Sequence, residues 1–277
     1  MTPIGIKAQK RLLLEAIVLL ALIIGLFFSN KPSIARIENI FWDARLKLLA
    51  KISEPDPRIA IITIDQASLN YFASKESIYW PWPRSIYGEI TKFLKNSGAR
   101  GIAYDILFTE PSVYGVEDDL SFGETATGSP PVVVAASLRE TASKPIDTEE
   151  RLKISLQPYT KYSNIFSSLK KQQYFAGITL PTETFGPLPL SVGNVSATPD
   201  SDGLFRSTAV AAKYNDRIVP SLPFALAALT GDLSNFSQDI PWNSHQEEEF
   251  EIRFYGPPRT IPTFGFASIA MSAAQLA

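Results

Sequence analysis

At 277 residues, the chain is long enough for one large domain or two small ones with a proper hydrophobic core. Hydrophobic residues make up 45% and charged residues 19%, which argues against disorder over most of its length. The 26 basic and 28 acidic side chains give a formal charge of −2, which offers no field to attract a polyanion and argues against a nucleic-acid binder. The chain has no cysteine and one histidine, His245, so any catalysis would depend on carboxylates, lysine, tyrosine or a cofactor. No cofactor motif is expected or found in the sequence.

An apolar stretch near the N-terminus predicts a membrane segment. Residues 12–28 contain a single charged side chain, Glu15, and follow a basic cluster of Lys7, Lys10 and Arg11. We therefore expect a basic cytoplasmic N-terminus over 1–11 and an uncleaved transmembrane helix over 12–30. This would make the chain single-pass in a membrane, with most of its residues extracytoplasmic. The alternatives are a cleavable signal peptide and a buried core helix.

The chain from residue 34 to residue 277 is predicted to form the extracytoplasmic domain. It opens with a second helix over 34–52, in which Ile37, Ile40 and Phe41 recur at helical spacing. The prolines that follow cannot continue a helix. This helix either forms a stalk next to the membrane or packs on the domain.

Strand and helix patterns alternate through the first half of this domain. The runs 58–64, 101–108 and 132–136 are apolar and rich in β-branched residues, which is typical of buried strands. A helix with inward-facing apolar residues is expected to start near Ser85, between the first two runs. This order predicts an α/β fold (mixed α+β), three-layer-like, with a largely parallel central sheet and right-handed crossovers.

The second half of the chain predicts a smaller, antiparallel part. A strand over 204–212 closes into a hairpin at 214–217, and residues 250–255 alternate as an exposed strand does. Two polar stretches, near 138–173 and near 231–249, show no sustained periodicity and are interpreted as insertions on the surface.

Several short motifs occur in a fixed order along the chain. They are Asp43 with Arg45, Ile64-Asp65, Trp80-Pro81-Trp82-Pro83-Arg84, Tyr104-Asp105-Ile106, Phe108 with Glu110-Pro111, Asp118-Asp119-Leu120, Gly193-Asn194-Val195, Asp200 to Gly203, and Phe254-Tyr255-Gly256. Taken together, over roughly residues 35 to 270, they resemble the type-two CHASE domain, an extracytoplasmic sensory module of bacterial membrane receptors. The most specific motif is the Trp-Pro-Trp-Pro-Arg segment between two Asp-bearing strands.

The resemblance implies a receptor input domain rather than an enzyme. Such a domain binds a stimulus, here unknown, and passes the signal through the membrane to a cytoplasmic output, such as an adenylate cyclase, histidine kinase, serine/threonine kinase or diguanylate cyclase. No cyclase or kinase signature occurs in this sequence, so the output would lie in cis or in trans. We expect the receptor to be a homodimer, and its ligand to be a small molecule or an envelope component.

Carboxylates and aromatic residues provide the candidate ligand site. Asp65 and Asp105 are predicted to follow neighbouring parallel strands, where α/β sheets place ligand sites. The ligand-binding candidates are Asp65, Trp80, Trp82, Arg84, Asp105 and Glu110. A hard cation would use Asp65, Asp105 and Asp118, which would suit a metal-dependent hydrolase as an alternative function. We favour structural roles, in which Asp65 caps the polar stretch after its strand, Asp118 caps the next helix and Asp105 pairs with Arg84.

The remaining motifs have a functional and a structural interpretation. Trp80 and Trp82 form either an aromatic wall for a ligand or, as we favour, a packing contact. Residues 200–203 are interpreted as a tight turn rather than a calcium loop, because the later spacing of such a loop is missing. His245, beside three glutamates, is expected in a solvated loop rather than a metal site. A non-sensing envelope scaffold is a further alternative function.

Overall fold

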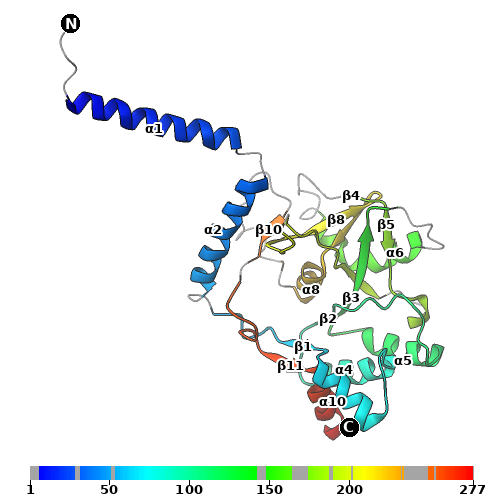
Figure 1. The fold of residues 1–277 in the computed structure, drawn as a ribbon. Helices are drawn as coiled ribbons and strands as arrows, with labels where there is room; N and C mark the ends of the chain where they lie inside the picture. Colours follow the sequence, from blue (N-terminus) through cyan, green and yellow to red (C-terminus); the bar gives the residue numbers. More distant parts are fainter. Residues whose placement is uncertain are drawn as a thin grey trace. The chain divides into compact units, whose positions relative to one another are not determined.

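The computed structural model describes residues 6–28, 32–50, 54–141, 148–163, 174–186, 190–200, 202–231, 233, 249–252 and 254–276 (Figure 1). Its α-helices are α1 (Ile6–Phe28), α2 (Pro32–Ala50), α3 (Gln66–Tyr71), α4 (Arg84–Asn96), α5 (Val116–Ala126), α6 (Thr148–Leu156), α8 (Leu222–Thr230) and α10 (Phe266–Leu276). The π-helix η1 covers Phe72–Glu76, and two short 3₁₀ helices are η2 (Gln157–Tyr162) and η3 (Glu183–Phe185). The strands are β1 (Ile61–Thr63), β2 (Ile102–Tyr104), β3 (Val132–Arg139), β4 (Tyr174–Phe175), β5 (Gly177–Thr179), β6 (Ser191–Asn194), β7 (Ser207–Ala209), β8 (Ala211–Tyr214), β9 (Arg217–Pro220), β10 (Glu249–Glu251) and β11 (Thr263–Gly265).

The chain divides into two compact units, which are described separately. Unit 1 consists of Met1–Pro55, Pro199–Leu204 and Arg253–Thr260, and it contains α1 and α2. Unit 2 consists of Asp56–Thr198, Phe205–Ile252 and Ile261–Ala277, and it contains the other elements.

A parallel sheet forms the centre of unit 2. Strand β3 pairs in parallel with β2 through Ile102↔Val132 and with β6 through Val133↔Ser191. The last residues of β3 also pair with β5 in the antiparallel direction. Five consecutive residues of β3, from 132 to 136, are almost completely buried, as expected for a strand covered on both faces. The structure confirms the predicted mixed α/β class and its largely parallel central sheet.

Helices cover both faces of this sheet. On one face, the ring of Tyr104 contacts Tyr87 of α4 and Phe122 of α5. On the other face, a Cβ at Gly193 would lie 2.5 Å from the Cα of Leu222 in α8, so only glycine allows α8 to approach β6 this closely. Side chains alternate along a strand and paired residues share a face, and through this register Tyr104 and Gly193 lie on opposite faces. Unit 2 therefore has the expected order of helix, sheet and helix.

Short strand pairs surround the central sheet. Strands β8 and β9 form an antiparallel hairpin closed by Asn215, which adopts a positive φ of 50°, and β10 pairs antiparallel with β7. The predicted antiparallel second part is therefore present. The strand expected over 204–212 is interrupted, because β7 and β8 pair with different partners on either side of Val210.

The structure corrects one sequence interpretation of this unit and leaves most of another outside its described residues. The polar stretch 138–173 is not a plain surface excursion, because it contains the end of β3, helix α6 and the turn η2, and Leu152 of α6 is completely buried. A few inward apolar residues in a polar helix leave too weak a periodicity to be recognised. Most of the stretch near 231–249, including His245, lies outside the described residues.

Unit 1 contains the two N-terminal helices and two loop segments. The expected second helix is confirmed as α2, and the expected turn over 200–203 is closed by a hydrogen bond from Gly203 N to Asp200 O (2.8 Å). The transmembrane prediction is not supported: among the described residues, no helix combines the length and the apolar character that a membrane crossing requires. In α1, Arg11 and Glu15 form an exposed ion pair of 3.0 Å.

Candidate functional site

The Trp-Pro-Trp-Pro-Arg segment leads directly into α4, and its two tryptophans have different environments. Trp82 is 1% exposed and packs on Phe72 and Phe266, with ring centroids 4.4 and 5.0 Å apart. Trp80 is 52% exposed and lies edge-on against Trp82 at 5.4 Å. Trp82 therefore has the packing role that we favoured, while Trp80 presents an aromatic face to solvent beside it.

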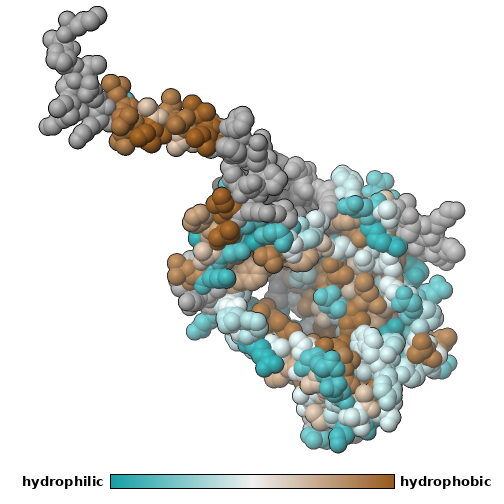
Figure 2. Space-filling view, in the orientation of Figure 1, coloured by the Kyte–Doolittle hydropathy of each residue, from teal (hydrophilic) through white to brown (hydrophobic). Residues whose placement is uncertain are grey.

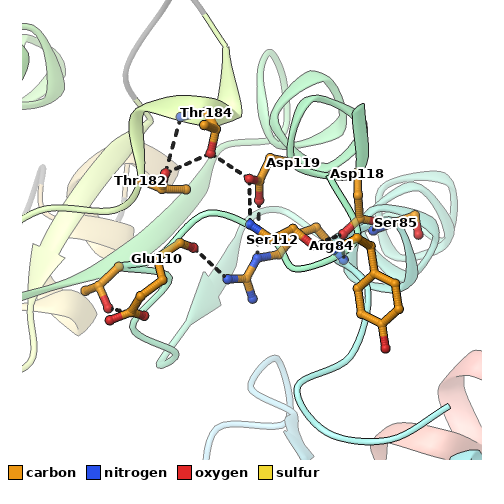
Figure 3. A network of polar contacts seen from close by, with 10 residues as sticks. Arg84, Ser85, Glu110, Ser112, Asp118, Asp119, Thr182 and Thr184 are labelled. Carbon is orange, nitrogen blue, oxygen red and sulfur yellow. Dashed lines mark hydrogen bonds and ion pairs between the residues drawn. The ribbon is translucent and has the colours of Figure 1, made fainter. Parts of the chain in front are cut away.

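Arg84, the first residue of α4, lies in a network of polar contacts (Figure 3). Its Nε atom forms an ion pair with Asp119 Oδ1 at 3.4 Å, and its Nη2 atom donates to the carbonyl oxygen of Glu110 at 3.2 Å. The guanidinium carbon also lies 4.6 Å from the centre of the Phe108 ring, a cation–π arrangement. The expected pair between Arg84 and Asp105 is wrong, because Asp119 takes this place.

Asp119 is the buried centre of this network. Its side chain is 0% exposed, and its Oδ2 atom accepts hydrogen bonds from Ser112 N (2.8 Å) and Thr184 Oγ1 (2.6 Å). Its Oδ1 atom makes no hydrogen bond among the described residues and faces Arg84 alone. A buried carboxylate needs such partners because an isolated charge in a protein interior is costly. Asp119 thus joins α4, α5, the loop before α5 and η3.

Asp118 has a different task from its neighbour. Its two carboxylate oxygens accept hydrogen bonds from the backbone N–H groups of Arg84 (2.6 Å) and Ser85 (2.9 Å), and Ser112 Oγ donates a third at 2.6 Å. The first N–H groups of a helix lack partners within the helix, and Pro83 before α4 provides no side-chain cap. The sequence prediction that Asp118 caps a helix is correct, but the helix is α4 rather than its own helix, α5.

The electrostatics of the network follow from these contacts. Burial alone would raise the pKa of Asp118, but the hydrogen bonds from Ser112, Ser85 and Arg84 outweigh it and lower the pKa below its ordinary value of 3.8. Nearby, burial raises the pKa of Tyr104 to about 12, partly offset by its hydrogen bond with Thr91. Asp118 therefore stays ionised and Tyr104 stays neutral over the physiological pH range.

The two aspartates proposed as a metal pair lie in separate parts of unit 2. Asp65 follows β1, which pairs with β11, while Asp105 follows β2, which pairs with β3. The prediction that they follow neighbouring strands is therefore wrong, because β11, whose residues pair with residues 202 positions earlier, takes the place beside β1. Asp65 Oδ1 caps α3 by accepting hydrogen bonds from Ser68 N (2.8 Å) and Ser68 Oγ (2.7 Å), so it has the capping role that we favoured, but the stretch that it caps is a helix. Asp105 is exposed.

No other arrangement of ligands replaces this pair. In the part of the chain that the structure describes, no three histidine, cysteine, aspartate or glutamate residues are placed to hold a metal ion. Asp118, the third metal candidate, already directs both oxygens at backbone N–H groups. Asp65 and Asp118 therefore have structural partners, and Asp105 is not placed with them, so the described residues give no support to the metal-dependent hydrolase.

The structure adds residues that sequence reasoning missed. Thr184 and Ser112 complete the shell around Asp119, and Phe266 brings the start of α10 against Trp82. Thr184 and Phe266 carried no local signal, since each is far from its partner in the chain. Glu110, a ligand candidate, has an exposed side chain and enters the network through its backbone carbonyl.

Comparison with known proteins agrees with this architecture. The family model for the CHASE2 domain matches residues 17–276, which is nearly the whole chain. The protein therefore belongs to the CHASE2 family of sensory, extracellular-type domains. No curated protein and no solved structure matches it.

Proposed function

We propose that this chain is the input domain of a bacterial membrane receptor, positioned outside the cytoplasm, and that it passes its signal to a cytoplasmic output domain in cis or in trans. The observation that carries the proposal is the CHASE2 match over residues 17–276. The site is consistent with a sensor, because its described ionisable groups cap helices and form ion pairs rather than assemble around a reacting centre.

The input surface in this proposal surrounds the start of α4. Trp80 offers an exposed aromatic face, and the loop after β2 adds the exposed carboxylates of Asp105 and Glu110. Arg84, whose side chain is 12% exposed, lies between this surface and the buried network. A stimulus acts on such a domain only if it binds two states of the domain with different affinity.

A chain of ring contacts offers a route from this surface to the C-terminal helix. Trp80 contacts Trp82, and Trp82 contacts Phe266 at the first position of α10. Interiors are packed at crystal-like density, so a shift of Trp82 must be followed by its neighbours. We place α10 on the output side of the sensor for this reason.

Cysteine labelling tests the location of the domain, and the chain is suited to it because it contains no cysteine. A Glu89→Cys variant places a thiol on the exposed side of α4, and Ile90→Cys is the matched control, since Ile90 is 2% exposed. In spheroplasts of a bacterial host, a membrane-impermeant maleimide should label the variant at position 89 without lysis, whereas position 90 should react only after unfolding. Labelling of position 89 that requires cell lysis would overturn the extracytoplasmic location.

A further inference from the structure

Helix α2 has its apolar side facing outward. The residues that share this side are Ile37, Ile40, Phe41, Ala44 and Leu48, here called the α2 apolar face. Its large members are more than half exposed, at 54% for Ile37, 67% for Ile40, and 66% for both Phe41 and Leu48. Figure 2 shows apolar residues at the surface along α2.

The opposite side of α2 is half-buried and more polar. Asn39, Trp42, Asp43 and Leu46 lie there, and Asn39 Nδ2 donates to Asp202 Oδ2 of the turn 200–203 at 3.3 Å. A helix that packs on its own domain normally shows the reverse pattern, with the apolar stripe inward. Contiguous apolar surface left in water marks an interaction site.

The spacing of this face fits another helix. Ile37, Phe41, Ala44 and Leu48 are separated by four, three and four residues, the repeat with which helices pack side by side in coiled coils. An antiparallel partner of the same sequence would place Ile37 opposite Leu48 and Phe41 opposite Ala44. In this antiparallel pair, Ile37 and Leu48 are of similar size and the small Ala44 faces the large Phe41. In a parallel pair, Phe41 would face Phe41 and Ala44 would face Ala44.

Charge supports the same arrangement. Glu38 and Arg45 lie on one flank of the α2 apolar face, seven residues apart. In an antiparallel pair, residues of one flank meet the same flank of the partner, so Glu38 would lie beside the partner's Arg45 on both sides of the two-fold axis. Both side chains are exposed. The guanidinium carbon of Arg45 also lies 5.2 Å from the centre of the Trp42 ring.

We propose that α2 pairs with α2 of a second copy of this chain, in the antiparallel direction, through the α2 apolar face. This proposal goes beyond the sensor function and does not depend on it, since it rests on unit 1 alone. It assigns the surface through which the chain forms a homodimer.

Disulfide cross-linking of the full-length chain in detergent tests the pairing. The double variant Ile37→Cys/Leu48→Cys should form covalent dimers on mild oxidation, because antiparallel packing brings the two positions within disulfide range. Leu48→Cys alone should form no covalent dimer, since its copies would lie about 16 Å apart along the axis, at about 1.5 Å per residue. The double variant Asn39→Cys/Leu46→Cys is the control. Its two positions would also lie level with each other in the antiparallel pair, but on the opposite side of the helix, so it should not cross-link.

Charge exchange provides an independent measurement. Glu38→Arg should weaken the dimer by about fivefold or more in analytical ultracentrifugation, because it faces the partner's Arg45 with a like charge. The double exchange Glu38→Arg/Arg45→Glu should restore the affinity.

Three results would overturn the proposal. Cross-linking of Leu48→Cys with itself would show a parallel pair. Failure of the 37/48 double variant to cross-link, with a monomer in ultracentrifugation, would exclude the second copy. If, in that case, the fluorescence emission of an environment-sensitive dye at position 48 shifted to the blue on addition of phospholipid vesicles, a membrane surface would be the occupant instead.

Discussion

Helices α4 and α2 are both amphipathic, but they direct their apolar sides to different surroundings. In α4, Tyr87 and Ile90 are at most 2% exposed and belong to the aromatic core of unit 2. In α2, Ile40 and Phe41 are about two-thirds exposed. Tertiary packing provides most of the stability of a helix in a protein. The comparison teaches that α4 obtains this stability from the core of its own unit, whereas the described residues of unit 1 leave the α2 apolar face to the partner proposed above.

Among the variants that test this comparison, a variant that disrupts the polar network at the start of α4 should have the largest effect on the free energy of unfolding. Asp119→Ala leaves Arg84 half-buried without its counter-ion, and we expect the free energy of unfolding to fall by about 3–5 kcal/mol. Urea denaturation followed by tryptophan fluorescence measures this loss, since Trp82 is buried in the same core. The double variant Arg84→Met/Asp119→Leu should lose less, because it removes both charges together. Equal losses in the two variants would show that the ion pair is not the cause.

Truncation of matched isoleucines compares the two helices directly. Ile90→Ala in α4 should cost about 3 kcal/mol, because it opens a cavity in a packed core. Ile40→Ala in α2 should change the stability of the monomer by no more than about 0.5 kcal/mol, since the side chain is 67% exposed. The same urea titration, performed at a concentration where the chain is monomeric, measures both. A similar cost for the two would mean that α2 is buried by its own chain after all.

Local patterns predicted much of the fold but few of its long-range partners. The apolar runs of β1, β2 and β3 and the proline-initiated helix α4 were recognisable because a few neighbouring residues determine them. The strand beside β1 was not recognisable, because β11 lies 202 residues later and has only three residues. Short strands carry too little periodicity to indicate which of them pair.

The candidate site shows the same limit. The sequence pointed to Arg84 and to a capping role for Asp118, but it paired Arg84 with Asp105 and assigned Asp118 to the next helix. The choice between Asp105 and Asp119 depends on where the loop before α5 turns back, and the hydrogen bond from Ser112 N to Asp119 determines that path. Such a contact is a property of the folded loop, and no spacing in the chain encodes it.

The cap of α4 should have a smaller effect than the ion pair or the buried isoleucine of α4, and the clearest pH dependence. Asp118→Ala removes the acceptor for two backbone N–H groups at the start of α4 and should cost about 1–2 kcal/mol at neutral pH. The folded-state pKa of Asp118 is lowered, so its contribution is present above the ordinary value of 3.8 and is lost as the pH falls through the lowered pKa. The difference in unfolding free energy between wild type and variant should therefore shrink progressively below about pH 4. Glu117→Ala, which changes the exposed neighbour in the same helical turn, is the control and should show no comparable loss at neutral pH. A difference between wild type and Asp118→Ala that stayed constant from pH 7 to pH 3 would show that the ionised carboxylate does not stabilise α4.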